Sequence, residues 1–177
     1  MMYEDLKYDM EEELFYSKED FLTRKAKKGI ADAMYLLGVL YFEGDQPEEA
    51  YSWFTKAAKK GQPDATYYLG NFYGHPKGFD LVEPNEQTMI EYWSKAADLG
   101  SPLAMCELGR RYRQGRGIEK NEAKAIELFE KAAELGYHEA FFWLSKCYKN
   151  GNGVEQNIEK AFEYTQKAYD ALSEEMI

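Results

Sequence analysis

Residues 104–136 contain two sequence patterns that recur along the chain. They read Ala104-Met-Cys-Glu-Leu108-Gly109-Arg-Arg-Tyr112, then Gly115-Arg-Gly117-Ile118, then Leu128-Phe129-Glu-Lys131-Ala132-Ala133-Glu-Leu-Gly136. The first part recurs at Ala33, Ala65 and Ala140, each time with Ala, Leu and Tyr at offsets 0, +4 and +8. These offsets lie on one face of an α-helix. The Lys-Ala part recurs over residues 53–61 and 92–100 and opens again at Tyr164.

The spacing of these copies predicts pairs of helices. Successive alanines of the first part are 32, 39 and 36 residues apart. A period of this length accommodates two helices of about 12–14 residues and two short turns, which is an αα-hairpin.

Residues that end and begin helices occur at matching offsets. Four glycines follow the Lys-Ala stretches, where a helix C-cap needs a left-handed residue: Gly29, Gly61, Gly100 and Gly136. Asparagines precede the second helix of three copies and are natural N-caps: Asn85, Asn121 and Asn157. We expect Asp45 with Pro47 and Glu48 to do this in the shorter first copy, and Ser17 to start a half-copy helix.

The combined pattern resembles the Sel1-like repeat, a relative of the tetratricopeptide repeat, over about residues 21–172. The resemblance implies an all-α solenoid of stacked antiparallel helix hairpins, with about four repeats at 30–61, 62–100, 101–136 and 137–172. Two departures are visible. The first repeat lacks four residues between Gly44 and Ala50, and residues 74–84 form a Pro/Gly-rich insertion that should bulge from the stack.

The ends are expected to differ from the repeats. Residues 1–29 are predicted to be acidic N-terminal capping helices, including a helix over 3–15, and residues 173–177 an acidic tail. Disorder or capping explains both ends, and a charged docking element is the alternative.

Small residues indicate close packing between helices. Gly38, Gly70 and Gly109 lie inside predicted helices, where each glycine costs about 0.5–1 kcal/mol relative to alanine. Packing must compensate, so Gly109→Leu is expected to disrupt the stack.

Composition excludes several classes of protein. The 177 residues are 45% hydrophobic, with net charge −10 and no apolar run of about 18 residues. The acidic start lacks the pattern of a signal peptide, so we expect the cytoplasm and no membrane partner. The negative charge disfavours nucleic acid as the main ligand. A monomer is favoured.

The residues that carry chemistry are sparse. His75 and His138 have no metal-ligand spacing around them, and Cys106 and Cys147 form no Cys-x-x-Cys pair. Gly115-Arg-Gly117 and Gly151-Asn-Gly153 follow helices, so they are read as turns and not as phosphate loops. We expect no metal, no cofactor and no catalytic residue.

Some secreted relatives carry a cysteine pair in each repeat and are linked to β-lactam binding or hydrolysis. The matching positions here resemble Ala133 and Phe141, which disfavours that branch. The chain is therefore predicted not to be an enzyme.

The first helix of each hairpin is expected to line a concave surface. With the core at offsets 0, +4 and +8, offsets +2, +3, +6, +9 and +10 should face outward. Aromatic, aliphatic and basic residues there predict a partner-binding site: Tyr35, Val39, Phe42, Tyr67, Asn71, Arg110, Arg113, Phe142, Trp143 and Lys146. Packing against adjoining repeats is an equal alternative for Leu36, Tyr68 and Trp143.

Three functions remain open. The first is a non-enzymatic interaction module or scaffold that binds a protein or peptide segment, apolar at one end and acidic at the other. The second is an immunity- or inhibitor-type protein that sequesters one basic partner. The third and weakest is a β-lactam-binding or hydrolysing enzyme.

Overall fold

The computed structural model describes residues 17–75 and 81–175, and in these ranges it contains nine α-helices and no strand. The chain divides into two compact units, Met1–Leu99 and Gly100–Ile177, which are described separately. The N-terminal unit contains α2 (Lys18–Lys27), α3 (Ala31–Glu43), α4 (Pro47–Lys59), α5 (Pro63–Gly74) and α6 (Glu86–Asp98). The C-terminal unit contains α7 (Pro102–Gln114), α8 (Glu122–Glu134), α9 (His138–Asn150) and α10 (Ile158–Glu175).

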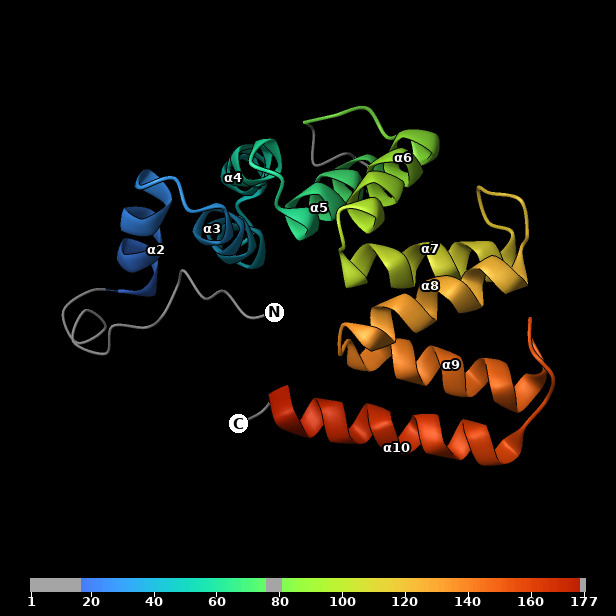
Figure 1. Ribbon diagram of the computed structural model, residues 1–177. Helices are drawn as coiled ribbons and strands as arrows, with labels where there is room; N and C mark the ends of the chain where they lie inside the picture. The colour runs from blue at the N-terminus through green and yellow to red at the C-terminus, as the bar shows by residue number, and fades with distance from the viewer. Residues whose placement is uncertain (1–16, 76–80, 176–177) are drawn as a thin grey trace. The chain divides into compact units, whose positions relative to one another are not determined.

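The helices pair as the repeat spacing predicts. The hairpins are α3 with α4, α5 with α6, α7 with α8 and α9 with α10. Within each unit, the second helix of one hairpin also packs on the first helix of the next, α4 on α5 and α8 on α9, while α2 packs on α3 (Figure 1). The predicted all-α architecture of stacked hairpins is confirmed.

Local sequence signals set most helix ends. Asn85, Asn121 and Asn157 accept hydrogen bonds from the backbone N–H three residues ahead, at 2.9, 2.9 and 2.8 Å. Ser17 caps α2 in the same way at 3.1 Å. Gln62 and Ser101 cap α5 and α7, which the sequence reading missed although the spacing is the same. Each cap satisfies an N–H group that has no partner within the helix.

The four predicted C-terminal glycines adopt the left-handed conformation that such positions require. Their φ angles are 90° at Gly29, 85° at Gly61, 99° at Gly100 and 82° at Gly136. A side chain is disfavoured at these angles, so these glycines end the helices by backbone geometry.

The predicted cap at Asp45 is wrong. Asp45 has φ 56°, and the residue before α4 is Gln46, whose side chain makes no capping hydrogen bond. The short first loop makes the chain reverse at Asp45, with Gln46 N–H donating to the Tyr41 carbonyl at 2.9 Å. Pro47 opens α4 as expected.

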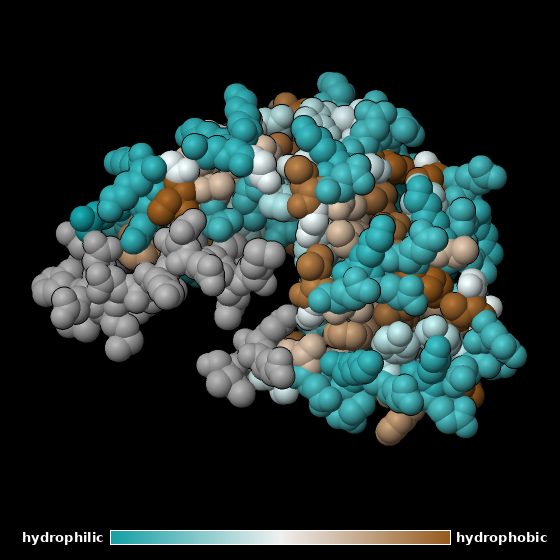
Figure 2. All heavy atoms as spheres, viewed as in Figure 1, coloured by the Kyte–Doolittle hydropathy of each residue, from teal (hydrophilic) through white to brown (hydrophobic). Residues whose placement is uncertain are grey.

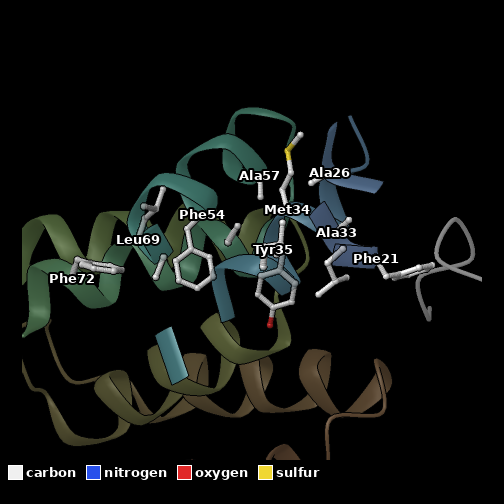
Figure 3. Packing of buried hydrophobic residues seen from close by; sticks show 13 residues of the cluster. Phe21, Ala26, Ala33, Met34, Tyr35, Phe54, Ala57, Leu69 and Phe72 are labelled. Carbon is white, nitrogen blue, oxygen red and sulfur yellow. The ribbon is translucent and has the colours of Figure 1, made fainter. Parts of the chain in front are cut away.

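Phe54 of α4 is fully buried in the hydrophobic core of the N-terminal unit. The core also contains buried side chains from α2, α3 and α5, which lie along the helices from Phe21 to Phe72 (Figure 3). A Cβ atom added at Gly38 would lie 2.5 Å from Phe54 Cδ1, and one at Gly109 would lie 2.6 Å from Phe129 Cε1. The predicted close approach at these glycines is confirmed, because each gives room to an aromatic ring of the paired helix.

Three expectations about the ends and the insertion have different outcomes. Helix α10 continues to Glu175, so residues 173–175 are helical and the predicted tail begins inside a helix. The helix predicted over 3–15 lies outside the described residues. Residues 76–80 of the insertion also lie outside the described residues. Gly74, the first residue of the insertion, is the last residue of α5.

Candidate binding surface

Tyr35 does not lie on the surface, which corrects the sequence prediction. Its side chain is 8% exposed, with its ring centroid 6.2 Å from that of Phe54 and 6.0 Å from that of Tyr68. Cys106, at the same offset in α7, is also buried. The prediction assigned each first helix one buried face. In a stack, such a helix packs on its own partner and on a neighbouring hairpin, which buries a wider arc.

Val39 and Phe42 of α3 are half-buried and pack against the core of the N-terminal unit. The Phe42 ring meets the ring of Tyr68 edge-on at 5.8 Å and that of Phe72 at 6.0 Å. Both residues therefore stabilise the unit, and only part of each side chain is available to a partner.

Tyr67 and Asn71 of α5 both contact Trp93 of α6. The Tyr67 ring stacks on the indole at a centroid distance of 5.8 Å, and Asn71 Oδ1 accepts a 2.8 Å hydrogen bond from Trp93 Nε1. These two predicted site residues thus help to hold α5 against α6 within one hairpin, while each keeps part of its surface exposed.

Trp143 of α9 packs against the preceding hairpin, which is the alternative to a surface position for this residue. Its ring stacks on Phe129 of α8 at 5.9 Å, with 12° between the planes. Tyr68 of α5 is at the same offset and stacks in the same way on Phe54 of α4, at 4.7 Å and 13°. An aromatic residue at offset +3 therefore joins successive hairpins in both units.

Three predicted basic residues gather around Trp143. The charged groups of Arg110, Arg113 and Lys146 lie 5.2, 5.1 and 4.3 Å from its ring centroid. These cations come from α7 and α9, and contact with the indole face holds them in place. We call these three cations with Trp143 the cationic cluster.

The cationic cluster is only partly neutralised. Arg110 pairs with Glu107 at 2.5 Å, and Glu139 accepts a 3.2 Å hydrogen bond from Trp143 Nε1. In residues 17–75 and 81–175, no carboxylate lies within ion-pair distance of Arg113 or Lys146. The Nε atoms of Arg110 and Arg113 are buried without a hydrogen-bond partner. Because no carboxylate of the described residues pairs with Arg113 or Lys146, the cluster can accept an additional anionic group.

Phe142 belongs to a different contact. It is half-buried on α9 and meets Tyr169 of α10 edge-on at 5.7 Å. The ten predicted residues therefore form separate contacts within each unit, and the cationic cluster is the one that brings several of them together.

Both cysteines are free and buried. Burial raises the pKa of the Cys106 thiol, and the nearby Glu139 and Glu107 raise it further. Burial also raises the pKa of the Cys147 thiol, although Arg113 partly opposes the shift. Both thiols therefore stay protonated near neutral pH, the form that is a poor nucleophile.

The described part of the chain contains neither a candidate metal site nor a candidate membrane span. No group of three or more His, Cys, Asp or Glu residues there could hold a metal ion. No helix among the same residues is long and apolar enough to span a bilayer. Ser145, a mid-helix serine, shares a 2.8 Å hydrogen bond with Thr165, which joins α9 to α10.

Solved structures show the same fold. A protective antigen with an SLR fold from uropathogenic Escherichia coli is 31% identical, with TM-score 0.70 over 88% of this chain and 33% of its own. The chain thus spans about a third of that protein. A Sel1 repeat protein from Oxalobacter formigenes is 26% identical, with TM-score 0.71 over 89% of this chain and 68% of its own.

A more distant structure, an immunity protein from Pseudomonas aeruginosa, is 19% identical, with TM-score 0.55 over 88% of this chain and 73% of its own. At that identity the likeness shows the fold alone. No curated protein matches the sequence.

The Sel1 repeat model matches four consecutive segments, residues 31–62, 63–101, 102–137 and 138–171. Each segment holds one hairpin of the structure, α3 with α4 through α9 with α10. Proteins built from these repeats are typically scaffolds for protein–protein interaction. With the matched segments, the paired helices and the related structures in agreement, the chain belongs to the Sel1 repeat family.

Proposed function

We propose that this protein is a non-enzymatic interaction module that binds a partner protein or peptide through the exposed faces of its first helices. The cationic cluster is the observation that carries the proposal. Arg113 and Lys146 are held against Trp143 and are paired with no carboxylate among the described residues. Fixed, unneutralised cations beside an aromatic ring are typical of residues that anchor interfaces.

The chemistry of the cluster favours an acidic segment of the partner. A guanidinium group binds a carboxylate through two parallel hydrogen bonds, and Lys146 adds a second positive charge. Because both groups are already restrained by the indole, binding costs less side-chain entropy than it does for free surface chains.

The test compares affinity capture by the wild type with capture by two charge-matched double variants. Arg113→Ala/Lys146→Ala removes two cations from the cluster. Lys131→Ala/Lys167→Ala removes two exposed cations from the second helices α8 and α10. Thermal melts first establish that both variants are folded.

We expect mass spectrometry to find partners that the wild type and the Lys131/Lys167 variant retain and the Arg113/Lys146 variant loses. The partners that the Arg113/Lys146 variant loses should also dissociate from the wild type as the salt concentration is raised, because salt screens charge pairs at the edge of an interface. Recovery of the same partners by both folded variants would show that the cluster is not the binding site.

A second candidate is an inhibitor- or immunity-type protein that sequesters a basic partner. The net charge of −10 favours it. So does its distribution, because residues 1–99 hold 19 acidic and 11 basic residues, a net charge of −8. Under this alternative, the captured partner is strongly basic and is retained by the Arg113→Ala/Lys146→Ala variant.

A further inference from the structure

Helix α10 exposes three large hydrophobic residues, of which Tyr169 also meets Phe142 of α9. Ile158, Phe162 and Tyr169 are 57%, 71% and 58% exposed. Their spacing of 4 and 7 residues places them in one stripe along the helix, which we call the α10 stripe. In Figure 2, hydrophobic atoms project among hydrophilic ones from the outer side of α10, at the lower edge of the view.

The same helix face is covered in the preceding repeats. The repeat alignment matches Phe162 to Ile126 of α8, which is 6% exposed, in a helix that packs on α9 of the next hairpin. It also matches Phe162 to Tyr51 of α4, whose ring meets Phe72 of α5 edge-on at 5.0 Å. At Tyr51 the covering ring belongs to the first helix of the following hairpin, and α8, which carries Ile126, packs on the corresponding helix α9. The α10 stripe is thus a surface of a kind that this fold covers with a helix.

Acidic residues lie directly beside the α10 stripe. Glu159, Glu163 and Asp170 each follow a residue of the stripe, so they repeat its spacing and form a parallel acidic row. All three side chains are exposed. Asp170 accepts a 2.9 Å hydrogen bond from Gln166, which holds its carboxylate on this side of the helix.

We propose that the α10 stripe is a second docking surface, whose occupant is an amphipathic helix of a partner protein with an apolar face and a basic flank. A helix is favoured as the occupant because helices pack on the matching position in the preceding repeats. A basic flank is favoured because the acidic row lies beside the stripe. A second copy of this chain fits less well. Two α10 helices paired antiparallel about a two-fold axis would bring their acidic rows together, and like charges oppose such pairing.

The test uses two synthetic stapled helices of about 18 residues, long enough to cover the stripe. Both have the same Leu/Ala face, and one has lysines and the other glutamates along its flank. Binding to the full chain is measured by fluorescence anisotropy.

Phe162→Ser/Tyr169→Ser removes two of the three stripe residues without changing the charge. The matched control Leu99→Ser/Leu135→Ser removes two exposed leucines from the turns after α6 and α8. Glu159→Gln/Glu163→Gln neutralises the acidic row, and Glu130→Gln/Glu134→Gln is its control on α8.

We expect the lysine helix to bind the wild type, and Phe162→Ser/Tyr169→Ser to weaken that binding roughly tenfold or more. Glu159→Gln/Glu163→Gln should weaken it as well, whereas both control variants and Arg113→Ala/Lys146→Ala should bind as the wild type does. The last variant separates this surface from the cationic cluster.

Three results would overturn the proposal. One is equal binding of the lysine helix by the wild type and Phe162→Ser/Tyr169→Ser, which indicates attraction to the negative chain as a whole. Another is no binding at peptide concentrations up to about 1 mM. The third is a dimer of the wild type in sedimentation equilibrium that Phe162→Ser/Tyr169→Ser dissociates, which makes a second copy the occupant.

Discussion

Gly109 shows how single residues set the distance between paired helices. Its missing side chain leaves room for Phe129, and Gly38 leaves the same room for Phe54 in the N-terminal unit. The aromatic rings are fully buried, so they cannot move aside without disturbing the core. At these positions, the gain from packing offsets the low helix propensity of glycine.

Gly109→Ala is expected to destabilise the protein by about 1–2 kcal/mol, because the cost of overpacking exceeds the gain in helix propensity. The measurement is urea unfolding followed by circular dichroism. In a Phe129→Leu background the same substitution should cost less, since the smaller side chain makes room. If Gly109→Ala lowers the free energy of unfolding equally in the two backgrounds, residue 109 does not contact the Phe129 ring.

Tyr51 carries the clearest pH dependence. Burial, followed by the nearby Tyr73, raises its pKa to about 12 from the ordinary value of 10.0. The unfolded chain therefore loses this proton first, and the stability that Tyr51 contributes is full below pH 10 and is lost as the pH rises toward 12. Tyr68, Tyr92 and Tyr164 shift in the same direction through burial.

We expect Tyr51→Phe to reduce the fall in melting temperature between about pH 9 and pH 11. Thermal melts at both pH values measure this, with the wild type as reference. If the melting temperature of Tyr51→Phe falls as much as that of the wild type, ionisation of Tyr51 does not contribute to the loss of stability at high pH.

Side-chain direction within the stack is the feature that sequence reasoning predicted least well. The offset of Tyr35 faces away from one helix face, which predicts a surface position, and the offset of Trp143 leaves a surface position and packing on a neighbouring repeat both open. The structure packs Tyr35 into the core and Trp143 on Phe129 of the preceding hairpin. Which arc of a helix is buried depends on neighbours some 30 residues away, and a periodicity measured within one helix does not contain that information.

At the scale of the element, helix ends follow from nearby residues, and these predictions succeeded. Asn85, Asn121 and Asn157 cap helices because the side chain and the N–H group that it accepts from are three residues apart. The prediction that Asp45 caps α4 was wrong because the shortened loop changes the backbone conformation at Asp45. A capping residue works only where the backbone is extended, which residue type alone does not establish.

Asn121→Ala is expected to lower the free energy of unfolding by about 1 kcal/mol, through loss of the 2.9 Å hydrogen bond to Lys124 N–H. Gln46→Ala is the control, because Gln46 precedes α4 without a capping bond. It should change stability by less than about 0.5 kcal/mol. Equal effects in urea unfolding would contradict the assigned caps.

At the scale of the molecule, charge is unevenly distributed. Residues 1–99 carry a net charge of −8 and residues 100–177 a net charge of −2, with the cationic cluster in the second range. Such an excess of one sign opposes the compact state by repulsion. It also favours a basic partner for the chain as a whole and an acidic one at the cluster.

Raising the salt concentration to about 0.3 M should raise the melting temperature, because screening weakens the repulsion. Differential scanning calorimetry measures the shift. A melting temperature that falls with salt would show that attractive charge pairs outweigh repulsion in the folded chain.

Binding of a partner on the first helices at the cationic cluster can be measured by amide hydrogen exchange of the chain, with and without a partner captured by the wild type. We expect added protection in α7 and α9 around Arg113 and Lys146. Protection confined to the second helices, with α7 and α9 exchanging as in the free protein, would contradict it.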